Sequence, residues 1–151
     1  MRSFLLLVAL LAPAAFAGET APVDHSAHAA APGPAVEAPP AGAKVFFVQP
    51  QPDAAVPGQL KVVFGVQGMA VQPAGEIKSG TGHHHLIIDA QPVPMGEVVP
   101  KDAQHLHFGD GATETTVNLT PGEHTLTLQF ADGIHRSYGP QMTATIKVKV
   151  Q

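Results

Sequence analysis

Hydrophobic and polar residues alternate along most of the chain after position 43, which is the pattern of strands that bury one face. The cleanest run is 123–130, where leucines and a phenylalanine occupy alternate positions with threonine and glutamine between them. Runs 60–67 and 142–150 alternate in the same way. No segment shows the period of about 3.6 residues that an amphipathic helix requires. The pattern therefore predicts an all-β domain.

Turn-forming residues separate these runs at intervals of roughly 8 to 15 residues. Pro121-Gly122 and Asp132-Gly133 bracket the run 123–130, and glycines and prolines predict irregular segments over 69–81 and 91–102. About seven short strands spaced in this way are typical of an immunoglobulin-like β-sandwich. A small barrel is the alternative.

The region before the strands has the layout of an exported protein. Residues 1–17 carry a basic Arg2, a short apolar stretch and a small-x-small site that ends at Ala17, which predicts a signal peptide and a mature chain that begins at Gly18. Residues 18–42 are rich in Ala, Pro and Gly and predict a disordered linker, in which two histidines could recruit a metal loosely. We therefore expect a periplasmic or secreted protein whose β-sandwich domain spans 43–151.

Net charge and cysteine content limit the classes of partner and of membrane attachment that we expect. Without the signal peptide the chain has 7 basic and 12 acidic residues, a net charge of −5 with histidine neutral, so we expect no nucleic acid partner. The chain has no cysteine, so it has neither a lipid attachment site of the thioether type nor a disulfide. No later stretch is apolar enough for stable membrane insertion. The sequence leaves a protein partner open.

Paired histidines are the sharpest chemical signal. In the segment GHHHLIID, the alternation of a strand places His83 and His85 on one face and His84 on the other, apolar face. A second pair with the same spacing, His105 and His107, follows in QHLHFGD. Imidazoles on one face can share a metal ion, so these two His-x-His units predict a metal site.

Further residues are candidates for the same site. Asp89 is in phase with His83 and His85 and is a candidate ligand or hydrogen-bond acceptor for an imidazole. His135 is a candidate ligand in a loop beside charged residues. His84 and His124 align with apolar positions and predict core or supporting histidines. The alternative for all of these histidines is an ordinary hydrogen-bonded place at the edge of a sheet.

The donor set indicates the metal. Without thiolates, a nitrogen-rich site suits copper first, since the order of intrinsic affinities favours it, and zinc second. Three methionines outside the signal peptide could serve Cu(I), but they are not spaced as a motif. Because imidazole must be neutral to coordinate, binding should weaken as pH falls through about 6.5.

We do not expect an enzyme. The chain has no Gly-x-Ser-x-Gly motif and no cysteine nucleophile. The sequence therefore favours a small exported metal-binding domain. The alternative is a metal-free interaction or structural domain of the envelope.

Three segments together resemble a known family: 46–71, 82–89 and 105–140 are similar to the uncharacterised bacterial domain of unknown function 4399. The resemblance implies an exported single domain and no particular activity.

A fainter resemblance links 49–56 and 121–135 to the periplasmic copper-resistance carriers of the CopC type, which are immunoglobulin-like domains. Those carriers bind copper with a histidine at the mature N-terminus, whereas this chain would begin with Gly18, and Ile134 intervenes before His135. The resemblance therefore points to no residue other than His135.

Overall fold

The structure, a computed structural model, describes residues 35–151. The predicted signal peptide and the first part of the predicted linker lie outside these residues. The described chain forms nine strands in two sheets and one short 3-10 helix, so the predicted all-β sandwich is confirmed. The two strands beyond the expected seven, β2 and β4, have only three and two residues. The elements are β1 (Lys44–Gln49), β2 (Ala54–Val56), β3 (Gln59–Gln67), β4 (Ala70–Val71), β5 (Thr81–Ile88), β6 (His105–His107), β7 (Glu114–Asn118), β8 (Gly122–Ala131), η1 (Pro140–Met142) and β9 (Thr143–Val150).

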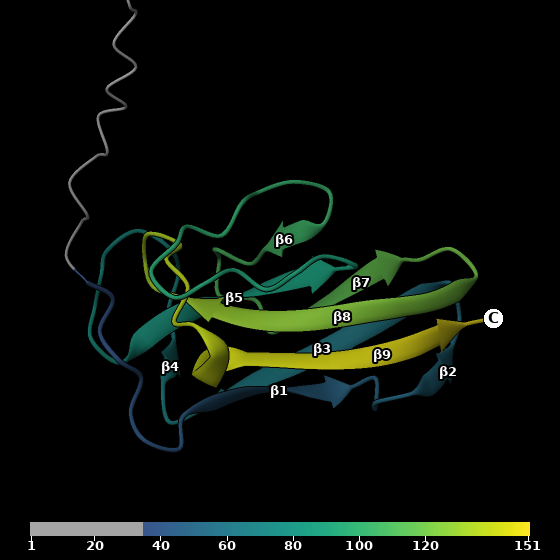
Figure 1. Cartoon of the computed structure of the whole chain (residues 1–151), viewed down its shortest axis with the longest axis horizontal. Helices are drawn as coiled ribbons and strands as arrows, with labels where there is room; N and C mark the ends of the chain where they lie inside the picture. The colour runs from purple at the N-terminus through teal and green to yellow at the C-terminus, as the bar shows by residue number, and fades with distance from the viewer. Residues whose placement is uncertain (1–34) are drawn as a thin grey trace, which may run out of the picture. The chain divides into compact units, whose positions relative to one another are not determined.

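The strands form two layers, with β8 and β9 crossing in front of β3 in Figure 1. One sheet has the order β1-β3-β7, and the other has the order β2-β9-β8-β5-β4, with β6 paired to β5. The strand β5 pairs antiparallel with β8 along one side and with β6 along the other. This places β5, which carries the three consecutive histidines, inside its sheet rather than at its edge.

The core fills the space between the two sheets. Leu60, Val62 and Phe64 of β3 meet Leu128 and Phe130 of β8 in one buried cluster. These are alternate positions on each strand, so the inward faces expected from the sequence are confirmed.

The outer face of the six-stranded sheet is also buried where β5 crosses it. Every residue from Thr81 to Ile87 is buried, although alternate side chains point away from the core. The irregular segment 89–104 covers part of this face and is hydrogen-bonded to it. Gln129 of β8 donates to the carbonyl of Val93 at 2.6 Å and accepts from its N–H at 2.9 Å. The sandwich therefore has a second buried layer over β5.

Residues 35–42, the last part of the predicted linker, lack regular secondary structure but contact the domain. Val36 packs against the core, and Ser79 Oγ donates to Glu37 Oε1 at 3.0 Å. Gln141 Nε2 donates to the carbonyl of Pro40 at 2.8 Å. The described residues include no helix with the length and apolar character needed to cross a membrane.

Candidate metal centre

Four histidines of the described chain come together on the outer face of β5. His83 and His85 lie two residues apart on that strand, and His107 of β6 stands opposite His85 in the antiparallel register. His135 comes from the loop that follows β8. Three separate segments therefore supply the cluster, which we call the four-histidine cluster.

The ring nitrogens of the cluster face one another. His85 Nε2 lies 3.1 Å from His83 Nε2, and His135 Nε2 lies 3.0 Å from His107 Nε2. Nitrogens of His83, His107 and His135 all lie within 4.8 Å of one another. Two nitrogens that bind one tetrahedral zinc ion at about 2.0 to 2.1 Å are themselves about 3.3 to 3.4 Å apart. His83, His107 and His135 therefore approach the spacing of ligands on one ion, and His85 adjoins this group through His83.

Burial keeps the imidazoles of His83, His85 and His107 neutral. His83 and His85 are 0% and 1% exposed. Burial, followed by the charges of His107 and His135, lowers the pKa of His83 to about 4. Burial and the neighbouring histidines lower the pKa of His85 to about 2, and burial also lowers the pKa of His107. At neutral pH these rings therefore offer lone pairs rather than positive charges.

Hydrogen bonds satisfy only half of the ring nitrogens of His83 and His85, because the two Nε2 atoms share one hydrogen bond of 3.1 Å. The Nδ1 atoms of His83 and His85 are buried and have no hydrogen-bond partner among the described residues. An unpaired buried polar group costs about 1 to 3 kcal/mol, and such groups in native proteins call for a functional explanation such as a bound ion. The burial of these two Nδ1 atoms therefore costs stability that no hydrogen bond among the described residues offsets.

A buried ion pair shapes the turn that carries His135. The Asp132 side chain, in a residue only 2% exposed, accepts from the N–H groups of Ile134 and Arg136 and from the Arg136 guanidinium at 2.8 Å. His135 adopts a φ of 73°, which is uncommon outside glycine, and its carbonyl accepts from Val99 N–H at 2.9 Å. The turn holds the strained residue in place and directs its ring to His107.

Gly109 fits closely against the ring of His107. A Cβ atom at this position would clash with His107 Cε1 and would lie 2.5 Å from His107 Nε2. Only a residue without a side chain leaves room for the imidazole in its observed place.

The structure does not bring His105 into the cluster. In the register of β6, His105 stands opposite Ile87, and its Nδ1 lies 2.8 Å from the carboxylate of Asp102. The second His-x-His unit therefore contributes one ring, His107, rather than two.

Asp89 also lies elsewhere. The strand β5 ends at Ile88, and Asp89 has a φ of 54°, so its side chain no longer follows the alternation of His83 and His85. Its carboxylate accepts from His124 Nδ1 at 2.7 Å and from Thr125 N–H at 2.8 Å. His124, which the sequence predicts in the core or in support of the site, therefore forms a hydrogen bond with Asp89 just after the end of β5.

His84 occupies the expected core position. Its ring packs between Phe64 and Phe130, with centroid distances of 4.8 and 4.9 Å. Burial lowers its pKa to about 4, so it too is neutral.

A pocket of about 470 Å³ adjoins the four-histidine cluster. Three of the histidines form part of its lining, together with residues of the covering segment 89–104. The lining residues are His85, Val98, Val99, Pro100, Lys101, His107 and His135.

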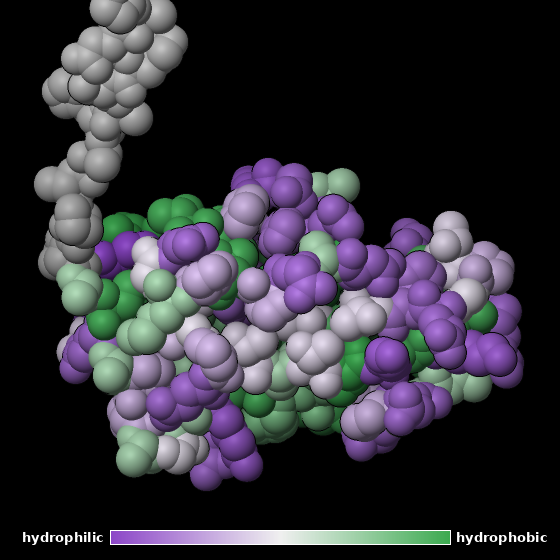
Figure 2. Space-filling model, viewed as in Figure 1, coloured by the Kyte–Doolittle hydropathy of each residue, from purple (hydrophilic) through white to green (hydrophobic). Residues whose placement is uncertain are grey.

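Exposed apolar side chains occur in the loops near this pocket. Ile77, Val98 and Ile134 are each more than 40% exposed. Figure 2 shows hydrophobic residues at the upper left of the visible face, where the loops before β5 and after β8 lie in Figure 1. Of these three side chains, Val98 belongs to the lining of the pocket.

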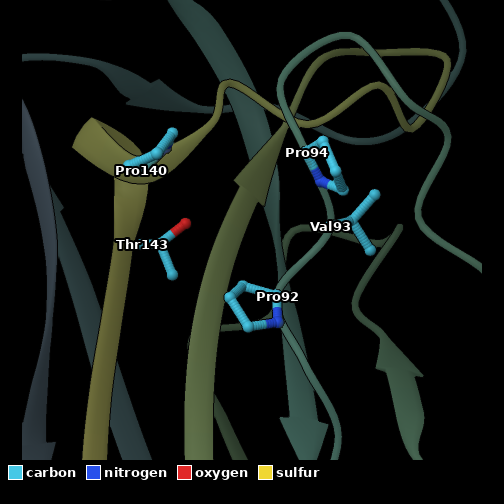
Figure 3. A pocket seen from close by; sticks show the side chains of 5 residues that line it. All are labelled: Pro92, Val93, Pro94, Pro140 and Thr143. Carbon is cyan, nitrogen blue, oxygen red and sulfur yellow. The ribbon is translucent and has the colours of Figure 1, made fainter.

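A second pocket of about 220 Å³ lies between the covering segment and the start of β9. Figure 3 shows Pro92, Val93 and Pro94 on one side of it and Pro140 and Thr143 on the other. Its lining contains no ionisable side chain, so it offers no coordination chemistry.

Sequence reasoning did not identify three residues that shape the site. Gly109 and Lys101 stand in segments without periodicity, so no local pattern marks them. Gln129 falls on the polar face of β8, which alternation assigns to solvent. A buried polar face becomes recognisable only when the segment that covers it is known.

The chain was compared with known proteins. No curated protein and no solved structure matches it. The family described as Domain of unknown function (DUF4399) matches residues 62–151, which include all four histidines of the cluster. The chain therefore belongs to this family, as the resemblance of its sequence segments predicts.

Proposed function

We propose that this protein is an exported, non-enzymatic metal-binding domain that holds one transition-metal ion between His83, His85, His107 and His135. The observation that carries the proposal is the convergence of ring nitrogens from three segments, with facing Nε2 atoms 3.0 and 3.1 Å apart. Ligands fixed on paired strands need little rearrangement to bind an ion.

Copper is the metal that this donor set favours, with zinc as the alternative. The chain has no cysteine, and the described cluster consists of imidazoles without a carboxylate. Nitrogen ligands suit both Cu(II) and Zn(II), and the intrinsic affinity of such sites is higher for copper. An oxidising compartment outside the cytoplasm would present copper as Cu(II).

Export rests on residues 1–17, which have the features of a signal peptide. The exported protein should begin at Gly18, and its intact mass after secretion measures this directly. A secreted protein that retains Met1 would contradict this part of the proposal.

The central experiment is a titration of Cu(II) and Zn(II) into the untagged, metal-free protein. We expect one ion per chain in the wild type. His85→Ala and His107→Ala should each weaken binding by at least about 10-fold, because even the loss of a supporting partner weakens metal sites by about 10 to 100-fold. The double variant should be weaker still.

His105→Ala is the matched control, because His105 belongs to the same His-x-His unit but is hydrogen-bonded to Asp102 instead of joining the cluster. Its affinity should equal that of the wild type. Equal affinities in all the variants, or no retained metal in the wild type, would refute the proposal and favour a metal-free interaction domain.

The pH dependence should follow the buried environment rather than free imidazole. Since the pKa values of His83 and His85 are lowered to about 4 and about 2, protons compete weakly with the metal at these two ligands near pH 6. Affinity should therefore fall over a more acidic range than the value of about 6.5 for free histidine. Titrations at about pH 7.5, 5.5 and 4 measure this shift.

A further inference from the structure

We propose that the bound metal ion takes a small organic monocarboxylate as an additional ligand, held in the 470 Å³ pocket by the metal and by Lys101. This inference rests on the proposed metal site. It adds an exogenous anion to the histidine ligands and gives a role to Lys101, which is not one of the four histidines.

The charge of the site calls for an anion. Four neutral imidazoles add no negative charge, so a divalent cation among them would leave a charge of +2 beside buried side chains. Burying an uncompensated charge is unfavourable. The nearest carboxylates are already engaged. The negative charge of Asp132 reaches His83, but Asp132 forms an ion pair with Arg136. The negative charge of Asp110 reaches His107, but its carboxylate accepts a hydrogen bond from Ala112 N–H.

Lys101 makes the need for an anion greater. It lines the same pocket as His85, His107 and His135, and its positive charge helps to lower the pKa of His107. Lys101 is exposed, so solvent weakens its repulsion with a bound cation, and an anion between the two charges would be attracted by both. An anion in this pocket would contact both charges at once.

The remaining lining selects an organic monocarboxylate. Val98, Val99 and Pro100 form an apolar part of the wall, which suits a short hydrocarbon chain. The volume lies within the range of about 300 to 1,000 Å³ that is usual for small-molecule sites. A phosphate dianion requires several hydrogen-bond donors. The backbone N–H of Val99 already donates to the carbonyl of His135, so Lys101 is the cationic donor that the described lining offers to an anion.

The test uses the full exported chain loaded with Cu(II). Acetate, butyrate and inorganic phosphate are titrated while the visible absorption of Cu(II) is recorded and the heat of binding is measured. Both carboxylates should shift the spectrum, because a carboxylate oxygen enters the coordination sphere. Butyrate should bind several-fold more tightly than acetate, since its additional methylene groups lie against Val98 and Pro100.

Lys101→Met keeps the length and apolar stem of the side chain but removes its charge. It should weaken butyrate binding by about 10-fold, the effect of losing one hydrogen bond to a charged group. Without carboxylate, Cu(II) should bind this variant as tightly as the wild type or more tightly, because a neighbouring cation is gone. Lys44→Met, on β1 in the opposite sheet, is the control and should change neither affinity.

The outcomes separate the two proposals. No Cu(II) binding with or without carboxylate overturns the proposed function. Stoichiometric Cu(II) binding with a spectrum that is indifferent to both carboxylates overturns the carboxylate site alone. A spectral response to phosphate but not to carboxylates overturns the assigned ligand class. Weaker Cu(II) binding by Lys101→Met in the absence of carboxylate contradicts the role given to Lys101.

Discussion

At the scale of single residues, the three consecutive histidines of β5 show how alternation produces two environments from identical side chains. His83 and His85 face the four-histidine cluster, whereas His84 is 0% exposed between Phe64 and Phe130. Neither ring nitrogen of His84 has a hydrogen-bond partner among the described residues. This histidine therefore adds to the pH sensitivity of the fold without taking part in the site.

Replacing His84 should stabilise the metal-free protein, most clearly in acid. Its pKa is about 4 in the folded state and about 6.5 when unfolded, so below about pH 6.5 the unfolded state binds the additional proton. The stability linked to this group is present above that value and is lost as pH falls toward 4. His84→Leu should be as stable as the wild type or more so at about pH 7.5, by up to about 1 to 3 kcal/mol, and its advantage should grow at about pH 5. Urea unfolding at the two pH values measures both effects.

His124 provides a control of the opposite sign. Its two ring nitrogens face acceptors, Asp89 and the carbonyl of Thr120, and the hydrogen bond to Asp89 raises its pKa. Its contribution is full below the unfolded pKa and is lost as pH rises through the folded value. His124→Gln should therefore lose more stability at about pH 5 than at about pH 7.5. A change in stability by His84→Leu that is the same at both pH values would contradict the protonation argument.

At the scale of structural elements, the turn after β8 decides whether His135 reaches the cluster. Asp132 organises this turn through its ion pair with Arg136 and its hydrogen bonds to the N–H groups of Ile134 and Arg136. Strand pairing places His83, His85 and His107, but the fourth ring depends on this short irregular segment. The turn is therefore a positioning element for the proposed ligand set.

Asp132→Ala should weaken both the fold and the site. Removing one partner of a buried ion pair costs about 3 to 5 kcal/mol, and loss of a supporting partner weakens metal affinity by about 10 to 100-fold. Asp132→Asn keeps an oxygen acceptor for the turn and should lose less of both. Urea unfolding and Cu(II) titration under conditions where each variant remains folded measure the two effects.

Asp102 offers the comparison, because its carboxylate binds His105 outside the cluster. Asp102→Ala should leave Cu(II) affinity unchanged. If the Asp132 and Asp102 variants bind copper equally well, the turn has no role in positioning His135.

At the scale of the whole molecule, residues just before the predicted domain start at 43 contact the two sheets and η1. Val36 packs against the core, and the carbonyl of Pro40 accepts hydrogen bonds from Ala43 N–H and from Gln141. These contacts join the segment before β1 to η1 near the far end of the sequence. The segment 35–42 should therefore contribute to stability although it contains no strand.

A chain that begins at residue 44 should be less stable than one that begins at residue 35, by about 1 to 2 kcal/mol, through loss of one partly buried valine and its neighbouring hydrogen bonds. Both chains should give the circular dichroism of an all-β protein, because the two sheets lie after residue 43. Urea unfolding compares their stabilities. Substantial helix in either chain, or equal stability of the two, would contradict this account.

The sequence by itself determined the properties that depend on neighbouring residues. Alternation predicted the buried faces of β3 and β8, and it placed His83 and His85 together and His84 in the core, because the period of a strand is a local property of the backbone. The prolines of 91–102 likewise predicted an irregular segment or an edge strand, and the structure has no strand there.

Only the tertiary structure decided which candidates meet. The register between β5 and β6 brings His107 beside His85 and leaves His105 beside Ile87, and the left-handed conformation of Asp89 turns its carboxylate to His124. The covering segment 89–104 lies over part of the outer face and brings Lys101 to the pocket, and burial on this face lowers the pKa values of His83 and His85. These relations join residues far apart in the chain, and strand alternation carries no information about register or about which face another segment will cover.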